Sequence, residues 1–73
     1  MNTIGEMILI HRRRLNASQS DVAKRAGVSR NTLSALENGD MNIKLLTLIK
    51  VVSAMGLNIR IQFHPKDEEG GDK

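Results

Sequence analysis

Apolar residues recur along the first 55 positions at the three- and four-residue spacing of amphipathic helices, and the spacing then changes to strict alternation. Leu57, Ile59, Ile61 and Phe63 alternate with polar residues, which is the period of a half-buried β-strand. No other stretch has this period. The pattern therefore predicts an all-α chain that ends in one β-strand.

Capping signals divide the helical pattern into elements. The sequence TIGE (3–6) has the form of a capping box and predicts a helix over residues 4–15, with Asn16 able to take the left-handed conformation that follows a helix. The sequence SQSD (18–21) is a second box-like start. Its helix should end just before Gly27, which supplies the positive φ of a tight turn.

Two further helices follow the same logic. Ser29 can cap a third helix that runs to about residue 37. Asn42 can cap a fourth, over about 43–55, which Gly56 then stops. The expected core joins apolar positions of all four helices: Ile4, Ile8, Leu15, Val22, Ala26, Val28, Leu33, Leu36, Leu45, Leu48 and Val52.

The fourth helix, IKLLTLIKVVSAMG (43–56), is apolar over more of its circumference than one core requires. At 100° per residue its apolar side chains spread over an arc of about 220°, against the ~100° stripe of a surface helix. The lone strand beside it would also leave its backbone unpaired, which is costly. A second copy of the chain solves both problems, with the two strands paired antiparallel across a two-fold axis. The expected dimer interface comprises Leu57, Ile59, Ile61, Phe63, Ile49 and Val52. In the alternative arrangement, the strand folds back on its own helices with one edge in water.

Chain length and composition also favour a partner chain. A chain of 73 residues is near the lower limit for folding alone, and it has no Cys for disulfides and only two His. We therefore expect no metal site and no cofactor. The chain has no membrane-spanning run and no signal-peptide pattern, so we expect a cytoplasmic protein.

Charge points to a polyanion as partner. The net charge of +3 combines a basic stretch over residues 1–65 with an acidic end, KDEEGGDK (66–73). The basic stretch favours binding to nucleic acid. Phe63 is the sole aromatic residue, so the rings on which unpaired bases stack are missing, and double-stranded DNA fits better than single-stranded RNA. We divide the chain into a DNA-binding and dimerisation domain (1–65) and a disordered acidic tail (66–73).

The most specific signal is QSDVAKRAGVSRNTLSALEN (19–38), where apolar residues have the spacing at which two helices close around a three-residue turn. Ala23 is small where the helices would cross, and Gly27 sits at the turn. The stretches LNASQSDVAKRAGVSRNTLSALENG and LLTLIKVVSAMG resemble the Cro/phage-repressor (XRE-type) helix-turn-helix family over nearly residues 4–56. The continuation GLNIRIQF is similar to HipB-type antitoxins, whose last strand pairs across the dimer.

This resemblance implies a compact, lambda-repressor-like four-helix domain that docks its third helix in the major groove of DNA. Matched position by position, the base-reading residues are Ser29, Arg30, Asn31 and Ser34. Arg30 can fork onto guanine and Asn31 onto adenine. Without the motif, the same residues would read simply as a solvated helix start.

Residues at other matching positions would contact phosphate or hold the fold. Gln19 and Asn38 match phosphate contacts, and Arg13 adds at most general electrostatic attraction. Arg12 matches an arginine that pairs with the glutamate ending the third helix, here Glu37, and we interpret the pair as structural. Gly27 and Ala23 are requirements of the fold. Asp40 and Met41 depart from the basic or small polar residues common in the family's following loop, which weakens the second phosphate contact.

Two functions are compatible with these features, and catalysis is not among them, because the sequence contains no catalytic constellation. The first is a sequence-specific transcriptional repressor that binds a pseudo-palindromic operator as a homodimer. The second is the antitoxin of a HipB-like pair, which neutralises a toxin protein and binds DNA to regulate its own operon. The HipB-like strand and the acidic tail motivate the second, although the tail reads equally well as a solubilising end.

Overall fold

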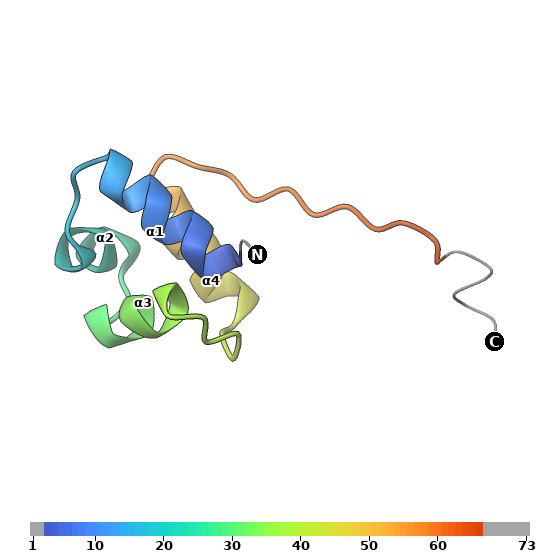
Figure 1. Ribbon diagram of the computed structural model, residues 1–73, viewed down its shortest axis with the longest axis horizontal. Helices are drawn as coiled ribbons and strands as arrows, with labels where there is room; N and C mark the ends of the chain where they lie inside the picture. Colours follow the sequence, from blue (N-terminus) through green and yellow to red (C-terminus); the bar gives the residue numbers. More distant parts are fainter. Residues whose placement is uncertain (1–2, 67–73) are drawn as a thin grey trace.

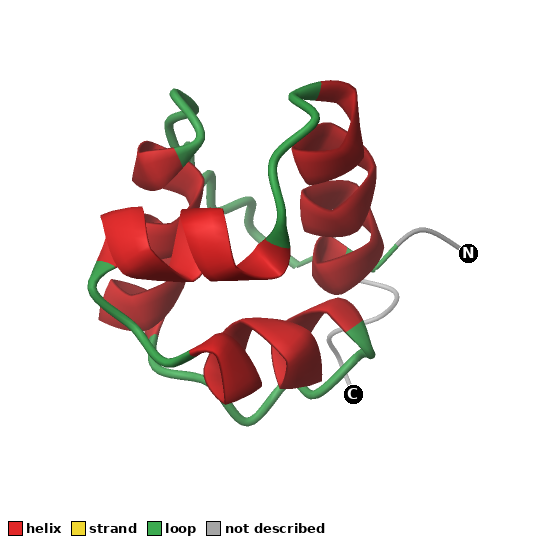
Figure 2. Ribbon diagram, turned by 90° about the vertical axis from the view of Figure 1, so that its left-hand side faces the viewer, coloured by secondary structure: helices red, strands yellow, loops and turns green. Residues whose placement is uncertain are grey.

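The computed structural model describes residues 3–66, which form four helices: α1 (Ile4–Arg14), α2 (Gln19–Ala26), α3 (Arg30–Glu37) and α4 (Leu45–Ala54). The helices gather into a helical body, residues 3–56, from which a C-terminal arm, residues 57–66, extends (Figure 1). All regular structure in residues 3–66 is helical (Figure 2). The four predicted helices are confirmed. The predicted strand is not formed within the described part of this single chain, so its pairing stays a prediction. Apart from Lys66, the acidic tail lies outside the described residues.

Helices α1 and α2 begin with reciprocal caps between side chain and backbone. The Glu6 backbone N–H donates to Thr3 Oγ1 at 3.1 Å, and the Thr3 N–H donates to Glu6 Oε1 at 2.8 Å. The same pair of bonds joins Ser18 and Asp21, at 3.0 and 3.1 Å. These bonds satisfy N–H groups that have no partner within a helix, and they fix both starts where the sequence predicts them.

All four helices end in the same hydrogen-bonding pattern. In each, the residue after the last turn has a positive φ, and the next N–H reaches back to a carbonyl five residues earlier, as in the bond from Ala17 N to Arg12 O. Asn16 has a φ of 56°, and Gly27, which begins the turn between α2 and α3, has a φ of 73°. A β-carbon disfavours this conformation, which explains why glycine or asparagine stands at these ends.

The start of α4 differs from the prediction. The Asn42 backbone N–H donates to Asp40 Oδ1 at 2.9 Å, so Asn42 belongs to a turn and does not cap a helix. The helix begins two residues later than expected, at Leu45, after Lys44, whose side chain makes no cap bond. Ile43, predicted to be the first helical residue, instead packs from the loop against the core.

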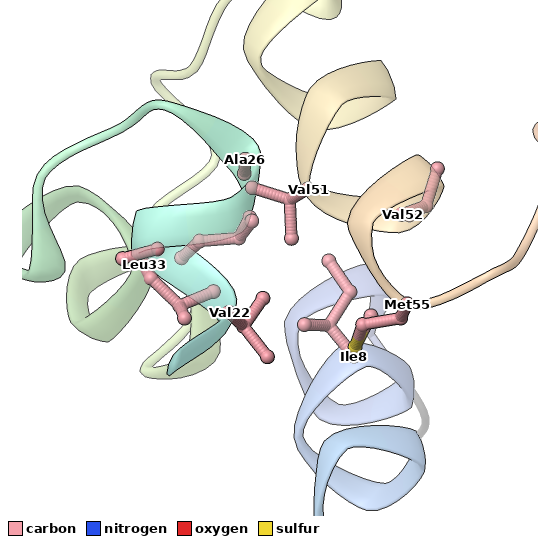
Figure 3. Packing of buried hydrophobic residues seen from close by; sticks show 9 residues of the cluster. Ile8, Val22, Ala26, Leu33, Val51, Val52 and Met55 are labelled. Carbon is pink, nitrogen blue, oxygen red and sulfur yellow. The ribbon is translucent and has the colours of Figure 1, made fainter. Parts of the chain in front are cut away.

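The core lies where α2 packs against both α3 and α4, and α1 packs against α3. Its largest fully buried side chains are those of Leu33, Leu36 and Val51. Figure 3 shows Val22 and Leu33 meeting side chains of α1 and α4 in one cluster. The full buried set is Ile8, Val22, Ala23, Ala26, Leu33, Leu36, Val51, Val52 and Met55.

Several residues expected in this core are exposed. Ile4, Leu15 and Leu45 each keep a large part of their surface in water, and the side chains of Met7 and Met41 are exposed as well. Val52, predicted both for the core and for the dimer interface, is buried within the body, as the first prediction requires. The apolar surplus on α4 is real, because Leu45, Leu46 and Ile49 stay exposed while Val51 and Val52 are buried.

A close contact between α1 and α3 depends on Gly5. A β-carbon at this position would lie 2.0 Å from the backbone carbonyl oxygen of Leu36, a distance that no side chain can occupy. Gly5 is buried and belongs to the first turn of α1. The missing side chain therefore sets how closely α1 approaches the end of α3.

An apolar groove lies between α1, α4 and the start of the C-terminal arm. Its apolar lining comes from all three elements: Ile4, Met7, Ile8, Leu45, Leu48, Val52, Leu57, Ile59 and Ile61. The arm makes the molecule elongated, with extents of 46 × 21 × 20 Å and a radius of gyration of 14.6 Å. A fully compact chain of this length has a radius of gyration of about 11 Å.

Candidate nucleic-acid interface

The central feature of the candidate interface is the pair of helices α2 and α3, joined by the turn Gly27–Ser29. Ala23 and Ala26 of α2 are buried, and small side chains on α2 allow it to pack closely against α3 and α4. On α3, Leu33 and Leu36 are fully buried, which anchors one side of the helix in the core. The opposite side of α3 is left to face outward as a fixed, rigid element.

The first turn of α3 presents two of the four residues that the sequence predicts to read bases. Arg30 and Asn31 are both exposed. Ser29, predicted to join them, is the N-cap: its Oγ accepts the Thr32 N–H at 3.0 Å and lies 2.8 Å from Thr32 Oγ1. Ser34 is half-buried. The structure therefore brings Arg30 and Asn31 together at an accessible helix start, while Ser29 and Ser34 are less available.

The start of α2 carries Gln19, the predicted phosphate contact. Ser18 and Asp21 cap this helix, and the hydrogen bonds between them lower the pKa of the Asp21 carboxyl below its ordinary value. The Gln19 side chain is half-buried, and its Nε2 donates to Glu37 Oε1 at 2.9 Å. One of its two amide N–H groups is thus used within the chain, and within residues 3–66 no hydrogen bond involves the other.

A buried ion pair ties this corner of the molecule together. Arg12 Nε donates to Glu37 Oε2 at 2.6 Å, and Arg12 Nη2 donates to Glu37 Oε1 at 3.0 Å. Arg12 Nη1 also donates to the carbonyl of Ala17, in the loop before α2, at 2.8 Å. The side chains of Arg12 and Glu37 are only 12% and 3% exposed. Together with Gln19, the pair fixes the end of α1, the start of α2 and the end of α3 relative to one another.

The pKa values of both partners reflect this contact. Burial alone would raise the pKa of the Glu37 carboxyl, but hydrogen bonds from Arg12 and Gln19 and the positive charges of Arg12 and Arg13 outweigh it, so the pKa is lowered. The hydrogen bond to Glu37 raises the pKa of the Arg12 guanidinium. Both groups are therefore charged at neutral pH, and the pair is held by charge-assisted hydrogen bonds.

The loop after α3 contains the second predicted phosphate contact. Asn38 is exposed and forms the C-cap of α3, and the loop then turns through the Asp40–Asn42 bond. Asp40 and Met41 are exposed, so a negative charge and an apolar side chain stand where a clamp on phosphate would need cations or polar groups. Arg13 is exposed near the end of α1.

Sequence reasoning missed two features of this site. One is the bond from Gln19 to Glu37, which joins residues 18 positions apart and has no local signature. The other is the role of Gly5 in seating α1 against α3. Its signal was present, since an isolated glycine inside a helical pattern is unfavourable and usually has a packing reason.

The described residues offer little else that suggests chemistry. In residues 3–66, no group of three or more His, Asp or Glu side chains is placed to hold a metal ion. Among the helices of this region, none has the length and apolar character needed to cross a membrane.

Comparison with known proteins agrees with this geometry. A family model for helix-turn-helix proteins matches residues 8–62. An uncharacterized HTH-type transcriptional regulator of Methanocaldococcus jannaschii is 37% identical over 54 residues, which cover 74% of this chain and 82% of the relative. Another, from Methanothermobacter thermautotrophicus, is 33% identical over 64 residues, 88% of this chain and 93% of the relative. The matched region includes α2, α3, α4 and all but the first turn of α1, and the chain belongs to the XRE-type helix-turn-helix family.

Proposed function

We propose that this protein is a transcriptional repressor that binds a pseudo-palindromic, double-stranded DNA operator as a homodimer. The observation that carries this proposal is the exposure of Arg30 and Asn31 on the first turn of α3, whose other side is fixed in the core by Leu33 and Leu36. Such a helix can enter a major groove without rearrangement. The two archaeal relatives are named as HTH-type transcriptional regulators, which supports a role in transcription.

In the proposed complex, Arg30 donates two hydrogen bonds to guanine O6 and N7, and Asn31 forms a bidentate pair with adenine N6 and N7. The start of α2 lies against the phosphate backbone, where the free amide N–H of Gln19 and the helix N-terminus attract a phosphate oxygen. Two copies of α3 about 34 Å apart would reach successive major grooves on one side of the duplex. Occupation of a promoter would then block transcription.

The decisive experiment is a selection of bound DNA from a random pool, with the mass of the complex measured alongside. We expect a two-fold symmetric site bound by two chains. The Arg30→Ala variant should bind that site about 1–3 kcal/mol more weakly and lose its preference at one base pair in each half-site. If its preference is unchanged, Arg30 does not read the operator.

Arg30→Lys is the matched control, because lysine keeps the charge but not the planar fork. We expect this variant to lose the base preference while it retains the salt dependence of the native protein. If the Arg30 charge lies near a phosphate, Arg30→Ala should also reduce the slope of log affinity against log salt concentration by about one. The pair of variants thus separates base reading from general attraction.

Gln19→Ala tests the backbone contact. It should weaken binding to all sequences about equally, since phosphate contacts carry no sequence information. Because Gln19 also donates to Glu37, the variant should lose about 1 kcal/mol of folding stability as well. A change in base preference would contradict the phosphate role.

The antitoxin function remains a second hypothesis, and one observation favours it: Phe63 is 92% exposed on the arm, where a foreign protein could also bind it. Purification from native cells separates the two functions. A second protein that co-purifies at fixed stoichiometry would support the antitoxin, whereas a homodimer without a further protein would count against it.

A further inference from the structure

The backbone of the C-terminal arm is available for pairing from residue 58 onward, except that Pro65 has no N–H to donate. The last backbone hydrogen bond before it runs from Leu57 N to Val52 O and belongs to the end of α4. Within residues 3–66, no hydrogen bond involves residues 58–66. An extended segment with free N–H and C=O groups is a template for another strand.

The apolar side chains of the arm become more exposed with distance from the helical body. Leu57 and Ile59 are half-buried against the core, Ile61 is 53% exposed, and Phe63 is 92% exposed. The groove between α1 and α4 is lined by the arm as far as Ile61, and Phe63 is not part of its lining. The largest apolar side chain of the arm, Phe63, therefore extends beyond the groove of its own chain, while that groove keeps exposed apolar residues such as Met7 and Leu45.

The geometry of antiparallel pairing limits how two arms can meet. Residues directly opposite each other point to the same face of a sheet, so odd-numbered apolar residues must pair with odd-numbered residues of the second copy. A two-fold axis at Ile59 would place Phe63 opposite Met55, which is already buried at the end of α4. An axis at Ile61 would place Leu57 opposite Pro65, which has no N–H to donate.

An axis at Arg60 avoids both difficulties. On the apolar face it places Leu57 opposite Phe63 and Ile59 opposite Ile61. On the polar face it places Asn58 opposite Gln62. The two-fold axis produces each of these pairs twice, once from each copy. We propose that the two arms of the homodimer pair in this register, and that Phe63 of the second copy lies beside Leu57 and covers the apolar groove between α1 and α4. This inference rests on the homodimer of the proposed function and specifies how that dimer is built.

This register has one unfavourable consequence that can be measured. The two Arg60 side chains stand opposite each other at the axis, on the solvent face, and like charges so placed repel. Added salt should therefore strengthen the dimer, because it screens the repulsion. Arg60→Gln should strengthen it as well and remove that salt effect. A dimer that is weakened by Arg60→Gln would contradict the arrangement.

Cysteine crosslinking tests the register directly, because the native chain has no cysteine. Asn58→Cys, Arg60→Cys and Gln62→Cys place a thiol at three sites that share the same face and the same type of backbone pairing. After mild oxidation of each variant separately, only Arg60→Cys should give a covalent dimer on a non-reducing gel. A mixture of Asn58→Cys and Gln62→Cys should crosslink, although neither does so by itself.

Other outcomes overturn the proposal in distinguishable ways. Efficient self-crosslinking of Asn58→Cys or Gln62→Cys, or of Ile59→Cys or Ile61→Cys above Arg60→Cys, would show another register. Light scattering of the same samples under reducing conditions gives the oligomeric state independently. If the native chain is a dimer but Arg60→Cys does not crosslink, the register is wrong and the homodimer stands; if the native chain is a monomer, the homodimer itself is wrong.

Phe63→Ala tests the occupant of the groove. Loss of the buried ring should raise the dissociation constant of the dimer about tenfold or more. Gln62→Ala, one residue away on the solvent face, is the matched control and should change it little. A Phe63→Ala dimer as tight as that of Gln62→Ala would show that the ring does not fill the groove.

Discussion

The helical body and the C-terminal arm differ in where their partners lie. In the body, the buried Glu37 carboxylate receives hydrogen bonds from both Arg12 and Gln19, and in residues 3–66 no buried side-chain polar atom lacks a partner. Along the arm, an equally regular pattern of apolar and polar residues meets neither a strand nor a complete apolar cover. The body therefore finds the partners of its buried groups within one chain. The sequence pattern of the arm is that of a strand whose partner lies outside the described part of this chain.

The largest effect should come from breaking the ion pair that closes the body. Arg12→Met would leave the Glu37 carboxylate buried with only Gln19 as donor, and we expect a loss of about 3–5 kcal/mol in the free energy of unfolding. Urea denaturation measures it. Arg13→Met, at an exposed neighbouring position, is the control and should change stability by less than about 0.5 kcal/mol.

The double variant Arg12→Met, Glu37→Met refines the interpretation. It removes the uncompensated charge, so it should recover much of the lost stability. Its DNA binding should nevertheless fall, because Gln19 loses the acceptor that orients it. If Arg12→Met alone is as stable as the native protein, the pair does not hold the body together.

The next largest loss of stability should come from disturbing the close contact between α1 and α3. Gly5→Ala places a methyl group 2.0 Å from the Leu36 carbonyl oxygen, so the two helices must separate, and we expect a loss of about 3 kcal/mol. Gly27→Ala is the matched control: nothing lies within 4 Å of its added methyl group, and only its φ of +73° is unfavourable. It should cost about 1–2 kcal/mol. A Gly5→Ala variant at least as stable as Gly27→Ala would contradict the close approach.

These two regions also show how far the sequence could predict the structure. Helices α1, α2 and α3 follow from local signals, because Thr3, Ser18 and Ser29 each bond to a backbone group three residues away. The start of α4 was predicted wrongly for an equally local reason. The Asp40 side chain accepts the Asn42 backbone N–H and holds Asn42 in a turn, so α4 begins later, after Lys44, without a side-chain cap.

Longer-range features were less accessible. Apolar spacing assigned Ile4 and Leu45 to the core, but spacing alone cannot show that α1 and α4 stand apart around a groove that these two residues line. It also assigned Leu15 to the core, and Leu15 is exposed. At the candidate interface, the family pattern located Arg30 and Asn31 on the first turn of α3. Ser29, which the same pattern placed among the base-reading residues, is occupied as the cap that the sequence also predicts. Neither signal indicated that Gln19 would bond to Glu37.

Acid should weaken the body in a way that identifies Glu37. Its pKa is lowered in the folded state, so the ion pair stabilises the fold above the ordinary value of 4.5, and this stabilisation is lost as the pH falls below 4.5 and through the folded value. The lowered pKa of Asp21 acts in the same direction. We expect urea midpoints to fall between about pH 6 and about pH 3.

Glu37→Gln supplies the control for this dependence. The amide keeps the shape but cannot titrate, so the variant should be less stable at neutral pH and should lose less stability on acidification than the native protein. Asp21→Asn should remove only the exposed capping contribution, which is the smaller part. Equal acid dependence in Glu37→Gln and the native protein would assign the effect to other carboxyl groups.

The smallest effect on the body should come from the arm, and that is what makes it informative. Ile61→Asp places a charge on the apolar face of the arm at a position that is already 53% exposed, so the unfolding free energy of the monomer should change by less than about 0.5 kcal/mol. The same charge would be buried between two arms, so the dimer and high-affinity operator binding should both be lost. Light scattering and operator titration at one protein concentration measure the two losses together. A variant that stays dimeric would refute pairing of the arms, and one that unfolds would show that the arm belongs to the body after all.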